Sequence, residues 1–469
     1  MSHERENWGS RFGFIMAAAG SAVGLGNIWR FPYLTGTSGG GAFILVYVLF
    51  ALFVGLSVML AEFTLGRYTA KAATGAYKQV SRQWTFVGFM GVLTALFIMG
   101  FYPVVGGWAT AYIFKGFTGL LQHPEAVEDV FGAFISDPVQ PLIWMVIYLA
   151  LNIAIVIKGI SGGIEKAGKV LMPTLFLLLV IIAIRGLTLP GASAGVSFLF
   201  KPDFSKLDGS VALAALGQAF FSLSLGMGCM ITYGSFLAKT EDLKGNALIV
   251  TIMDTCIALL AGLAMFPAAF AYGVDPAAGP GLIFVVMPTV FANMGGLGQV
   301  FHVLFFIAFT VAALTSSISL MEVVVDYFIE QHHKTRKQAV LYTSIIMVIM
   351  CVLASLSLGV MADFHILGVG VFDFLDILTD KVYMAIGGML LCLCVGWSVK
   401  KEDIYNEVTN NGELKFGLFG LWYGLIRFVN PILIAIVSVS GLIANENRAL
   451  MIAGLASIGV MAIFSKKMS

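Results

Sequence analysis

Twelve long apolar segments account for most of the sequence. They lie near residues 12–35, 41–66, 86–114, 141–157, 170–187, 211–237, 246–272, 299–328, 339–360, 371–397, 418–443 and 448–464. About 20 residues of apolar helix cross the hydrocarbon core of a bilayer. Because lipid cannot satisfy backbone N–H and C=O groups, segments of this length and continuous apolarity must span a membrane as helices. The sequence therefore predicts an all-α polytopic membrane protein, with twelve transmembrane helices in a single domain over residues 1–469.

The composition supports this fold class and argues against others. Hydrophobic residues make up 59% of the chain and charged residues 11%, whereas an ordinary soluble domain has about 25% charged residues. No basic patch with interleaved aromatic residues indicates a nucleic-acid partner. The five cysteines fall inside apolar segments without metal-ligand spacing, so we interpret them as packing residues.

Lysine and arginine gather in the terminal segments and in every second loop between the predicted spans. These basic residues are Arg5, Arg11, Arg67, Lys71, Lys78, Arg82, Lys158, Lys166, Lys169, Lys239, Lys244, Lys334, Arg336, Lys337, Lys400, Lys401, Lys415, Lys466 and Lys467. The intervening stretch over residues 122–138 has acidic residues and no lysine or arginine. Since basic loops remain in the cytoplasm, we predict that both termini are cytoplasmic.

Two predicted spans are interrupted by glycine at matching places. Residues 20–27 in span one read GSAVGLGN, and residues 221–228 in span six read FSLSLGMG. Glycine in a helix interior costs about 1 kcal/mol, and paired interruptions are typical of transporters built from inverted repeats. Because the two lie five spans apart, we predict repeats over about 8–187 and 211–397, followed by appended helices over about 418–464. Close helix packing through small residues is the alternative interpretation.

An interrupted helix offers two kinds of ligand at mid-membrane. One half-helix end exposes carbonyl oxygens, which suit a small cation, and the other exposes N–H groups, which suit a carboxylate. The interruptions therefore indicate an amino acid and Na⁺ as a natural pair of cargoes.

Specific motifs surround the first interruption and recur along the chain. Residues 24–33 read GLGNIWRFPY, residues 39–43 read GGGAF, and Glu62 precedes GRY at residues 66–68. The span-six motif and LTSS at residues 314–317 follow later in the chain. From Arg5 to about residue 440 the chain resembles the neurotransmitter:sodium symporter family, especially its bacterial amino-acid transporters. The resemblance implies sodium-coupled symport by alternating access in the bacterial cytoplasmic membrane, and no enzymatic activity.

The resemblance also implies two sodium sites made of oxygen ligands. The first site would use one carbonyl and three side chains, from Ala22, Asn27, Ser222 and Asp254. The second would use three carbonyls and two hydroxyl groups, from Gly20, Val23, Ala312, Thr315 and Ser316. The span-eight members are three and four residues apart and share one helix face. Taken alone, such hydroxyl groups more often bond to their own helix backbone.

Asp254 departs from the family pattern. Related proteins often have asparagine there, and chloride-dependent members hold an anion nearby through Tyr, Gln and Ser residues. Tyr47, Gln218 and Ser222 are present, but Ala258 stands where a further serine is expected. An ionised Asp254 would supply the charge that chloride supplies elsewhere, so we predict chloride-independent transport. The alternative is a structural pair with a buried base, but no lysine or arginine lies in the neighbouring midspans.

Gly24 narrows the substrate class, because amine-carrying relatives have aspartate at this position. The resemblance assigns the substrate carboxylate to the Tyr102 hydroxyl and to N–H groups near Leu25 and Gly26, with Phe221 as a lid. The substrate-contacting residues carried over are Ala22, Gly24, Leu25, Gly26, Ile98, Tyr102, Phe221, Ser222, Ser224, Met227, Ser316 and Leu320. Because the side-chain pocket is apolar, we predict a hydrophobic or aromatic substrate such as tyrosine, tryptophan or leucine.

Charged residues near helix ends predict a gate on each side of the site. The residues carried over are Arg30 and Asp376 for the outer gate, and Arg5, Trp8 and Glu330 for the inner gate. Glu330 is one carbon longer than the usual aspartate of the family, and solvated charge is the alternative interpretation there.

Two other function classes fit the sequence less well. Residues 159–163 match G-x-S-x-G, but the nucleophile elbow of a serine hydrolase needs a strand-to-helix turn. Here the match lies in a short basic loop, and no His-Asp pair can be placed with it. A channel or receptor is the other class, because a scaffold alone does not fix function. Occluding gates and an ion site completed by substrate favour coupled transport instead.

Overall fold

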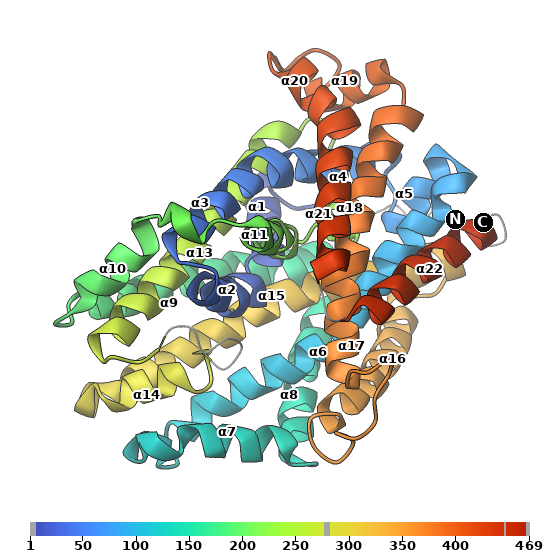
Figure 1. Ribbon diagram of the computed structural model, residues 1–469. Coiled ribbons are helices and arrows are strands. Elements are labelled where there is room, and N and C mark those ends of the chain that lie inside the picture. Colours follow the sequence, from blue (N-terminus) through green and yellow to red (C-terminus); the bar gives the residue numbers. More distant parts are fainter. Residues whose placement is uncertain (1–5, 276–281, 445–446, 466–469) are drawn as a thin grey trace.

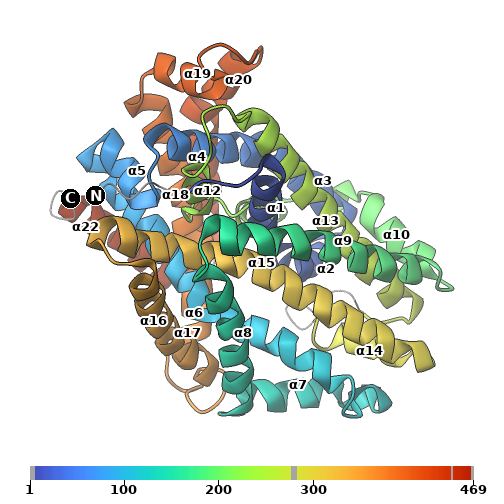
Figure 2. The same ribbon diagram turned by 180° about the vertical axis from the view of Figure 1, so that it is seen from behind.

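The computed structural model describes residues 6–275, 282–444 and 447–465, and within these residues it is a bundle of helices without a β-sheet (Figures 1 and 2). Each predicted span coincides with helix. In chain order the spans hold α1 (Arg11–Ala22) with α2 (Phe31–Thr37), α3 (Gly41–Phe50) with α4 (Leu56–Thr69), α6 (Thr85–Lys115), α8 (Gln140–Val156), α9 (Glu165–Leu187), α11 (Gly209–Ser222) with α12 (Cys229–Gly234), α13 (Leu243–Ala271), α15 (Gly298–His332), α16 (Arg336–Leu356), α17 (Val371–Leu378) with α18 (Met384–Leu393), α20 (Phe419–Gly424) with α21 (Asn430–Ala444), and α22 (Arg448–Phe464). The all-α membrane fold class is confirmed.

Length and composition divide these spans into three groups. Eight helices in the described part of the chain are continuous, long and apolar enough to cross a membrane. Span one is a pair of helices bent by 47° at its break, and α8 forms a second bent pair with the helix before it. The apolar helices α11 and α22 are shorter, at 14 and 17 residues. Span six is short because its helix is interrupted, as predicted.

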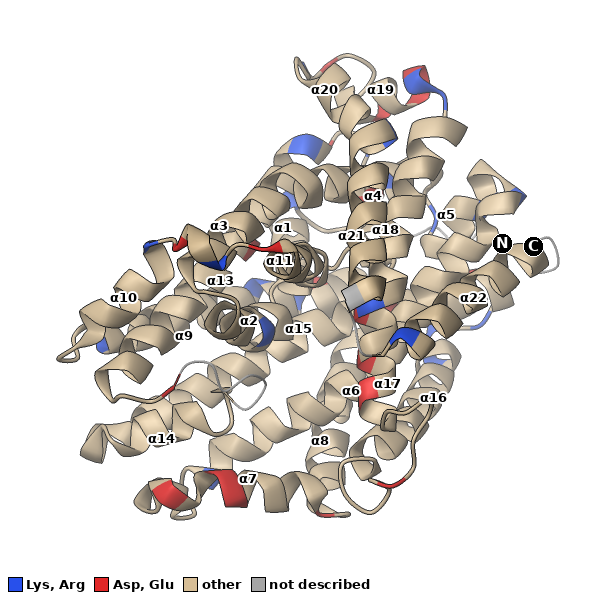
Figure 3. Cartoon of the chain, in the orientation of Figure 1, with Lys and Arg blue, Asp and Glu red and all other residues tan. Residues whose placement is uncertain are grey.

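Short helices in the loops lie at two opposite ends of the bundle. Those that follow odd-numbered spans are α7 (Val127–Ser136), α10 (Ala192–Phe200) and α14 (Val286–Ala292), and those that follow even-numbered spans include α5 (Ala73–Val80) and α19 (Lys401–Thr409). Figures 1 and 2 show α7, α10 and α14 at one end and α5 and α19 at the other. The segregation agrees with the alternation of charge along the chain, and the membrane-spanning stretches are mostly free of charge (Figure 3). The assignment of the basic end to the cytoplasm stays a prediction.

Spans three and eight form the centre of the bundle. In the most apolar stretch of each, 78% of the residues are buried, against 28% in span eleven. The helix α15 packs against α1, α6 and α9. The helix α6 also packs against α8. Small residues permit close approach between membrane helices, and a Cβ added to Gly106 of α6 would lie 2.5 Å from the Tyr148 ring of α8. The helix α1 of span one and the helix α12 of span six therefore both pack against α15 in the centre of the bundle.

Candidate functional site

The helix of span one stops at the predicted interruption. Val23 makes the last regular helical bond of α1. The next N–H groups turn to side chains: Gly24 N donates to Asn27 Oδ1 at 3.2 Å, and Leu25 N donates to Tyr102 Oη at 3.0 Å. A buried N–H group without a partner is costly. These polar partners therefore stabilise the break as part of the folded structure.

Span six is also interrupted, between Ser222 and Cys229. Ser224, Gly226 and Gly228 have φ angles of 54°, 75° and 80°. Glycine adopts this left-handed region without steric cost, whereas a serine there is uncommon. The backbone of the break is thus set by the glycines that marked it in the sequence.

The two breaks contact one another. Ser224 Oγ donates to the carbonyl of Ser21 at 2.8 Å, and Gln218 Nε2 donates to the carbonyl of Gly26 at 2.7 Å. A Cβ on Gly26 would lie 3.0 Å from Phe221 Cδ1. The fold therefore brings together residues that the sequence assigned separately to spans one and six.

Glu62 holds the break of span six from the side. Its carboxylate is 1% exposed and accepts a hydrogen bond from Gly226 N at 2.7 Å. Behind that residue, a Cβ on Gly226 would overlap the carbonyl of Met384, and a Cβ on Gly387 would lie 2.5 Å from the carbonyl of Gly226. Glu62 was predicted only as part of a sequence motif, with no role in the site. The available signal was an acidic residue inside an apolar span, where charge is expensive and usually functional.

Asp254 lies at the centre of a buried polar cluster with the other side chains predicted for the first sodium site. Its oxygens accept from Asn27 Nδ2 at 2.7 Å and from Ser222 Oγ at 2.8 and 3.0 Å. Tyr47 Oη donates to it at 3.3 Å. The carboxyl group is fully buried, and no lysine, arginine or histidine in the described residues forms an ion pair with it. A buried carboxylate without a base is unfavourable, so the cluster is suited to a small cation.

The second predicted sodium site is also assembled. Thr315 Oγ1 donates to the carbonyl of Val23 at 3.3 Å and to that of Ala312 at 3.0 Å. A Cβ on Gly20 would lie 3.1 Å from Thr315 Cβ. Four of the five predicted residues therefore meet where α1 ends against α15. A hard cation prefers such carbonyl and hydroxyl oxygens. A bound cation would take the place of the Thr315 hydroxyl proton as the partner of the two carbonyl oxygens.

Gly24 faces Tyr102 and Ser316 at very short range. A Cβ on Gly24 would lie 2.5 Å from Tyr102 Oη and 2.5 Å from Ser316 Cβ. No side chain fits there without displacing one of these neighbours. The hydroxyl group of Tyr102, which accepts from the N–H of Leu25, is thus held directly against the backbone of the break.

The residues predicted to line the side-chain pocket are buried beside this backbone. Ile98, Phe221, Met227 and Leu320 are 1, 8, 2 and 2% exposed and belong to one hydrophobic core. Ser224 adds a hydroxyl group that is already bonded to span one. A group that binds here meets mainly apolar carbon and sulfur.

The outer gate differs from the sequence prediction. Arg30 pairs with Asp380, not with Asp376: the guanidinium lies 2.5 Å from both carboxylate oxygens. Its Cζ also lies 4.8 Å from the centre of the Phe221 ring, in cation–π contact. Asp376 lies one turn earlier on the same span and makes no ion pair within 4.0 Å among the described residues. The predicted pairing of Arg30 with Asp376 is therefore wrong, whereas the lid role of Phe221 stays a prediction.

The inner gate is only partly visible. Arg5 lies outside the described residues. Trp8 Nε1 donates to the carbonyl of Tyr233 at 3.0 Å, and the two rings pack edge to face. Glu330 accepts from Ala72 N at 3.0 Å, where α5 begins. Trp8 and Glu330 therefore each fasten a different segment at the basic end of the bundle.

The chain is similar to known proteins over most of its length. A model of the sodium:neurotransmitter symporter family matches residues 5–132 and 131–451. The chain belongs to this family. The symporter is 39% identical to an uncharacterized sodium-dependent transporter of Bacillus subtilis over 434 residues, which cover 92% of this chain and 96% of the relative. A sodium-dependent transporter of Haemophilus influenzae is 35% identical, with 94% and 98% covered.

A solved structure of the same family is similar throughout. The crystal structure of MhsT in complex with L-phenylalanine has a TM-score of 0.87 and 44% sequence identity, and covers 93% of this chain and 100% of that chain. The present symporter is thus a multi-pass membrane protein for sodium-coupled transport, and not an enzyme.

Asp380 gives a direct test of the corrected outer gate. We expect Asp380→Asn to lower the initial rate of sodium-driven uptake by the symporter about ten-fold or more, because Arg30 loses its buried carboxylate. Asp376→Asn is the matched control and is expected to cost less than about three-fold, since it removes a carboxylate that Arg30 does not contact. Equal losses in the two variants, at equal protein amounts in the membrane, would show that the assignment is wrong.

Proposed function

We propose that this symporter carries a hydrophobic or aromatic L-amino acid into the bacterial cell, driven by Na⁺ and independent of chloride. The observation that supports this most is the bare backbone at Gly24, beside the Tyr102 hydroxyl group and the Leu25 N–H. An aspartate at residue 24 would hold a cationic amine, but it has no space there. The substrate must therefore supply its own carboxylate.

The rest of the substrate would lie against Ile98, Phe221, Met227 and Leu320. These side chains offer burial of apolar area, worth about 25 cal/mol per Å², and no charge to pair with an acidic or basic side chain. Met227 is flexible and polarizable, so the pocket can adapt to different apolar shapes. The bound phenylalanine of MhsT, at 44% identity, supports the same class of substrate.

We assign two Na⁺ ions to the two oxygen clusters. The first ion would lie between Ala22, Asn27, Ser222 and Asp254, and the substrate carboxylate would complete its shell. The second would lie between Gly20, Val23, Ala312, Thr315 and Ser316. Because the first cation and the carboxylate neutralise one another in a buried site, each binds better when the other is present. This mutual dependence is what couples the substrate to the sodium gradient.

The location follows from the same proposal. The bacterial origin of its relatives and its apolar spans suit the cytoplasmic membrane, with both termini and the helices α5 and α19 on the cytoplasmic side. Alternating access would then open the site first toward Arg30 and Asp380, and later toward the end that carries Trp8 and Glu330.

Purified protein in liposomes tests the driving ion. We expect an inward sodium gradient to drive accumulation of radiolabelled leucine or tyrosine. Replacement of external Na⁺ by K⁺ or choline is expected to lower the initial rate at least about ten-fold, because the first cation site and the substrate carboxylate then lack their partner. Replacement of chloride by gluconate, with Na⁺ retained, is expected to leave the rate unchanged. Loss of uptake in gluconate would contradict the role given to Asp254.

Competition among the twenty amino acids tests the substrate class in the same vesicles. Apolar and aromatic amino acids are expected to inhibit uptake best, while glycine, glutamate and lysine inhibit weakly. An amine such as tyramine, which lacks the carboxylate, is the matched control for tyrosine and is expected not to compete. Strong competition by glutamate or by the amine would contradict the proposed substrate class.

A further inference from the structure

Asp380 forms ion pairs with two bases, Arg30 and Lys381. Besides the contact with Arg30, its Oδ2 lies 2.7 Å from Lys381 Nζ. The side chains of Arg30 and Asp380 are 7% and 3% exposed, whereas that of Lys381 is 38% exposed. One buried carboxylate is therefore shared between a buried base and a half-exposed base.

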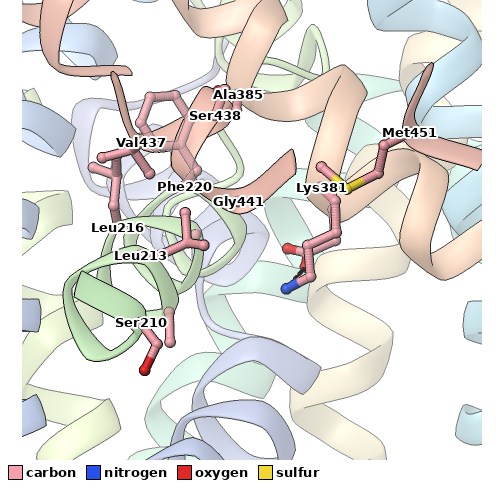
Figure 4. Close-up of a pocket in the computed structure, with 13 residues that line it drawn as sticks. Ser210, Leu213, Leu216, Phe220, Lys381, Ala385, Val437, Ser438, Gly441 and Met451 are labelled. Atoms are coloured by element: carbon pink, nitrogen blue, oxygen red, sulfur yellow. Dashed lines mark ion pairs between the residues drawn. The ribbon is translucent and has the colours of Figure 1, made fainter. Parts of the chain in front are cut away.

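The Lys381 side chain lies along a pocket that is separate from the substrate site. The pocket has a volume of about 210 Å³ and lies between α11, α18, α21 and α22, with Leu213, Phe220, Val437 and Met451 in its apolar wall. Figure 4 shows the Lys381 side chain at this pocket, with its ammonium group directed to the acid that it pairs with. A lysine in a membrane helix ordinarily extends toward the interface. Here it turns to Asp380 instead.

The two bases differ in whether they lie on the same segment of the chain as the acid. Arg30 lies on span one, at the end of the π-helical turn Gly26–Arg30, whereas Lys381 follows Asp380 in the π-helical turn Thr379–Tyr383. In an outward opening that separates span one from span ten, Arg30 would leave the carboxylate. Lys381 moves with Asp380, because the two are neighbours on one segment.

We infer that Lys381 is a positioning residue of the outer gate, which keeps the Asp380 carboxylate paired while Arg30 is withdrawn. A buried charge that loses its partner is strongly unfavourable. With a second base on the same turn, the open gate retains an ion pair, so opening costs less free energy. In the closed gate Asp380 keeps Arg30 whether or not Lys381 is present, so Lys381 acts on the open state and the path to it.

The inference rests on the proposed transport function and is tested by the kinetics of substrate release. Wild-type protein and Lys381→Met are loaded with radiolabelled leucine in saturating Na⁺ and then chased with excess unlabelled leucine. Methionine retains the length and apolar stem of lysine and fits the apolar wall of the pocket. Opening of the gate would then leave the Asp380 carboxylate without a paired base. We therefore expect leucine to dissociate from Lys381→Met about ten-fold more slowly than from the wild type, with equilibrium affinity for leucine unchanged or tighter.

Three further variants give the controls. Lys381→Arg retains a cation and is expected to release leucine within about two-fold of the wild-type rate. The double variant Asp380→Asn with Lys381→Met has no carboxylate at residue 380 that could be left without a base. Fast release of leucine is therefore expected to return. Lys400→Met changes an exposed lysine away from the gate and controls for the loss of a surface charge.

The possible results separate the inference from the proposed function. If wild-type protein shows no sodium-dependent binding of apolar amino acids, the proposed function fails before Lys381 is tested. If wild-type protein binds and Lys381→Met releases leucine at the wild-type rate, the inference alone is wrong. Faster release with weaker affinity also overturns it, because that result describes a damaged site. Slow release that persists in the double variant overturns it as well.

Discussion

Sodium-driven uptake is expected to fall about 100-fold or more when Gly24 is replaced by alanine. The added methyl carbon would lie 2.5 Å from both Tyr102 Oη and Ser316 Cβ, well inside van der Waals contact. Overpacking of this kind costs about 1–3 kcal/mol where the neighbours can move. Here the neighbours are the group proposed to hold the substrate carboxylate and a proposed ligand of Na⁺. Their displacement would damage both sites at once.

Gly424→Ala is the matched control for this substitution. Gly424 also lies in a membrane span, and a Cβ there would meet nothing within 4 Å. We expect this variant to retain wild-type uptake. The measurement is the initial rate of leucine uptake in liposomes, normalised to protein, together with equilibrium binding. If Gly24→Ala binds leucine as tightly as the wild type, the carboxylate is not held at this backbone.

The second large effect is expected for Asp254→Asn. The change keeps an oxygen atom in place but removes the negative charge from a fully buried cluster. Loss of one partner from a buried charge pair costs about 3–5 kcal/mol. We therefore expect the Na⁺ concentration for half-maximal leucine binding to rise about 100-fold or more, with little uptake at ordinary sodium concentrations.

Two comparisons make the Asp254 result specific. Asp363→Asn removes an exposed carboxylate elsewhere in the chain and is expected to leave the sodium dependence unchanged. Uptake by wild-type protein in gluconate shows whether chloride contributes before the charge is removed. Unchanged sodium dependence in Asp254→Asn would exclude this carboxylate from the cation site.

Local features of the sequence predicted the breaks, because glycine and asparagine inside an apolar span are unfavourable in a continuous membrane helix. Asp254 was also identifiable, as a lone carboxylate in a long apolar helix. Its partners Asn27 and Ser222 lie on other spans, and only the family resemblance brought them together in advance. The structure then showed the contacts as hydrogen bonds of 2.7 to 3.0 Å.

The outer gate shows why the remaining residues could not be chosen from sequence. Asp376 and Asp380 are four residues apart and share a helix face, so either could meet Arg30. The π-helical turn Thr379–Tyr383 inserts an extra residue into the helix and changes which acid faces span one. Glu62 escaped assignment for a similar reason, because its role depends on where span two passes the break of span six.

The contact between Gly226 and Met384 has a mechanical consequence. Backbone meets backbone there without an intervening side chain, so spans six and ten cannot slide past each other freely. Met384 is one helical turn from Asp380. Any tilt of the interrupted segment that closes around the cargo must therefore also move Asp380, the acid of the outer gate. Occupancy of the substrate site is then passed to the outer gate through this direct contact, without a chain of distant residues.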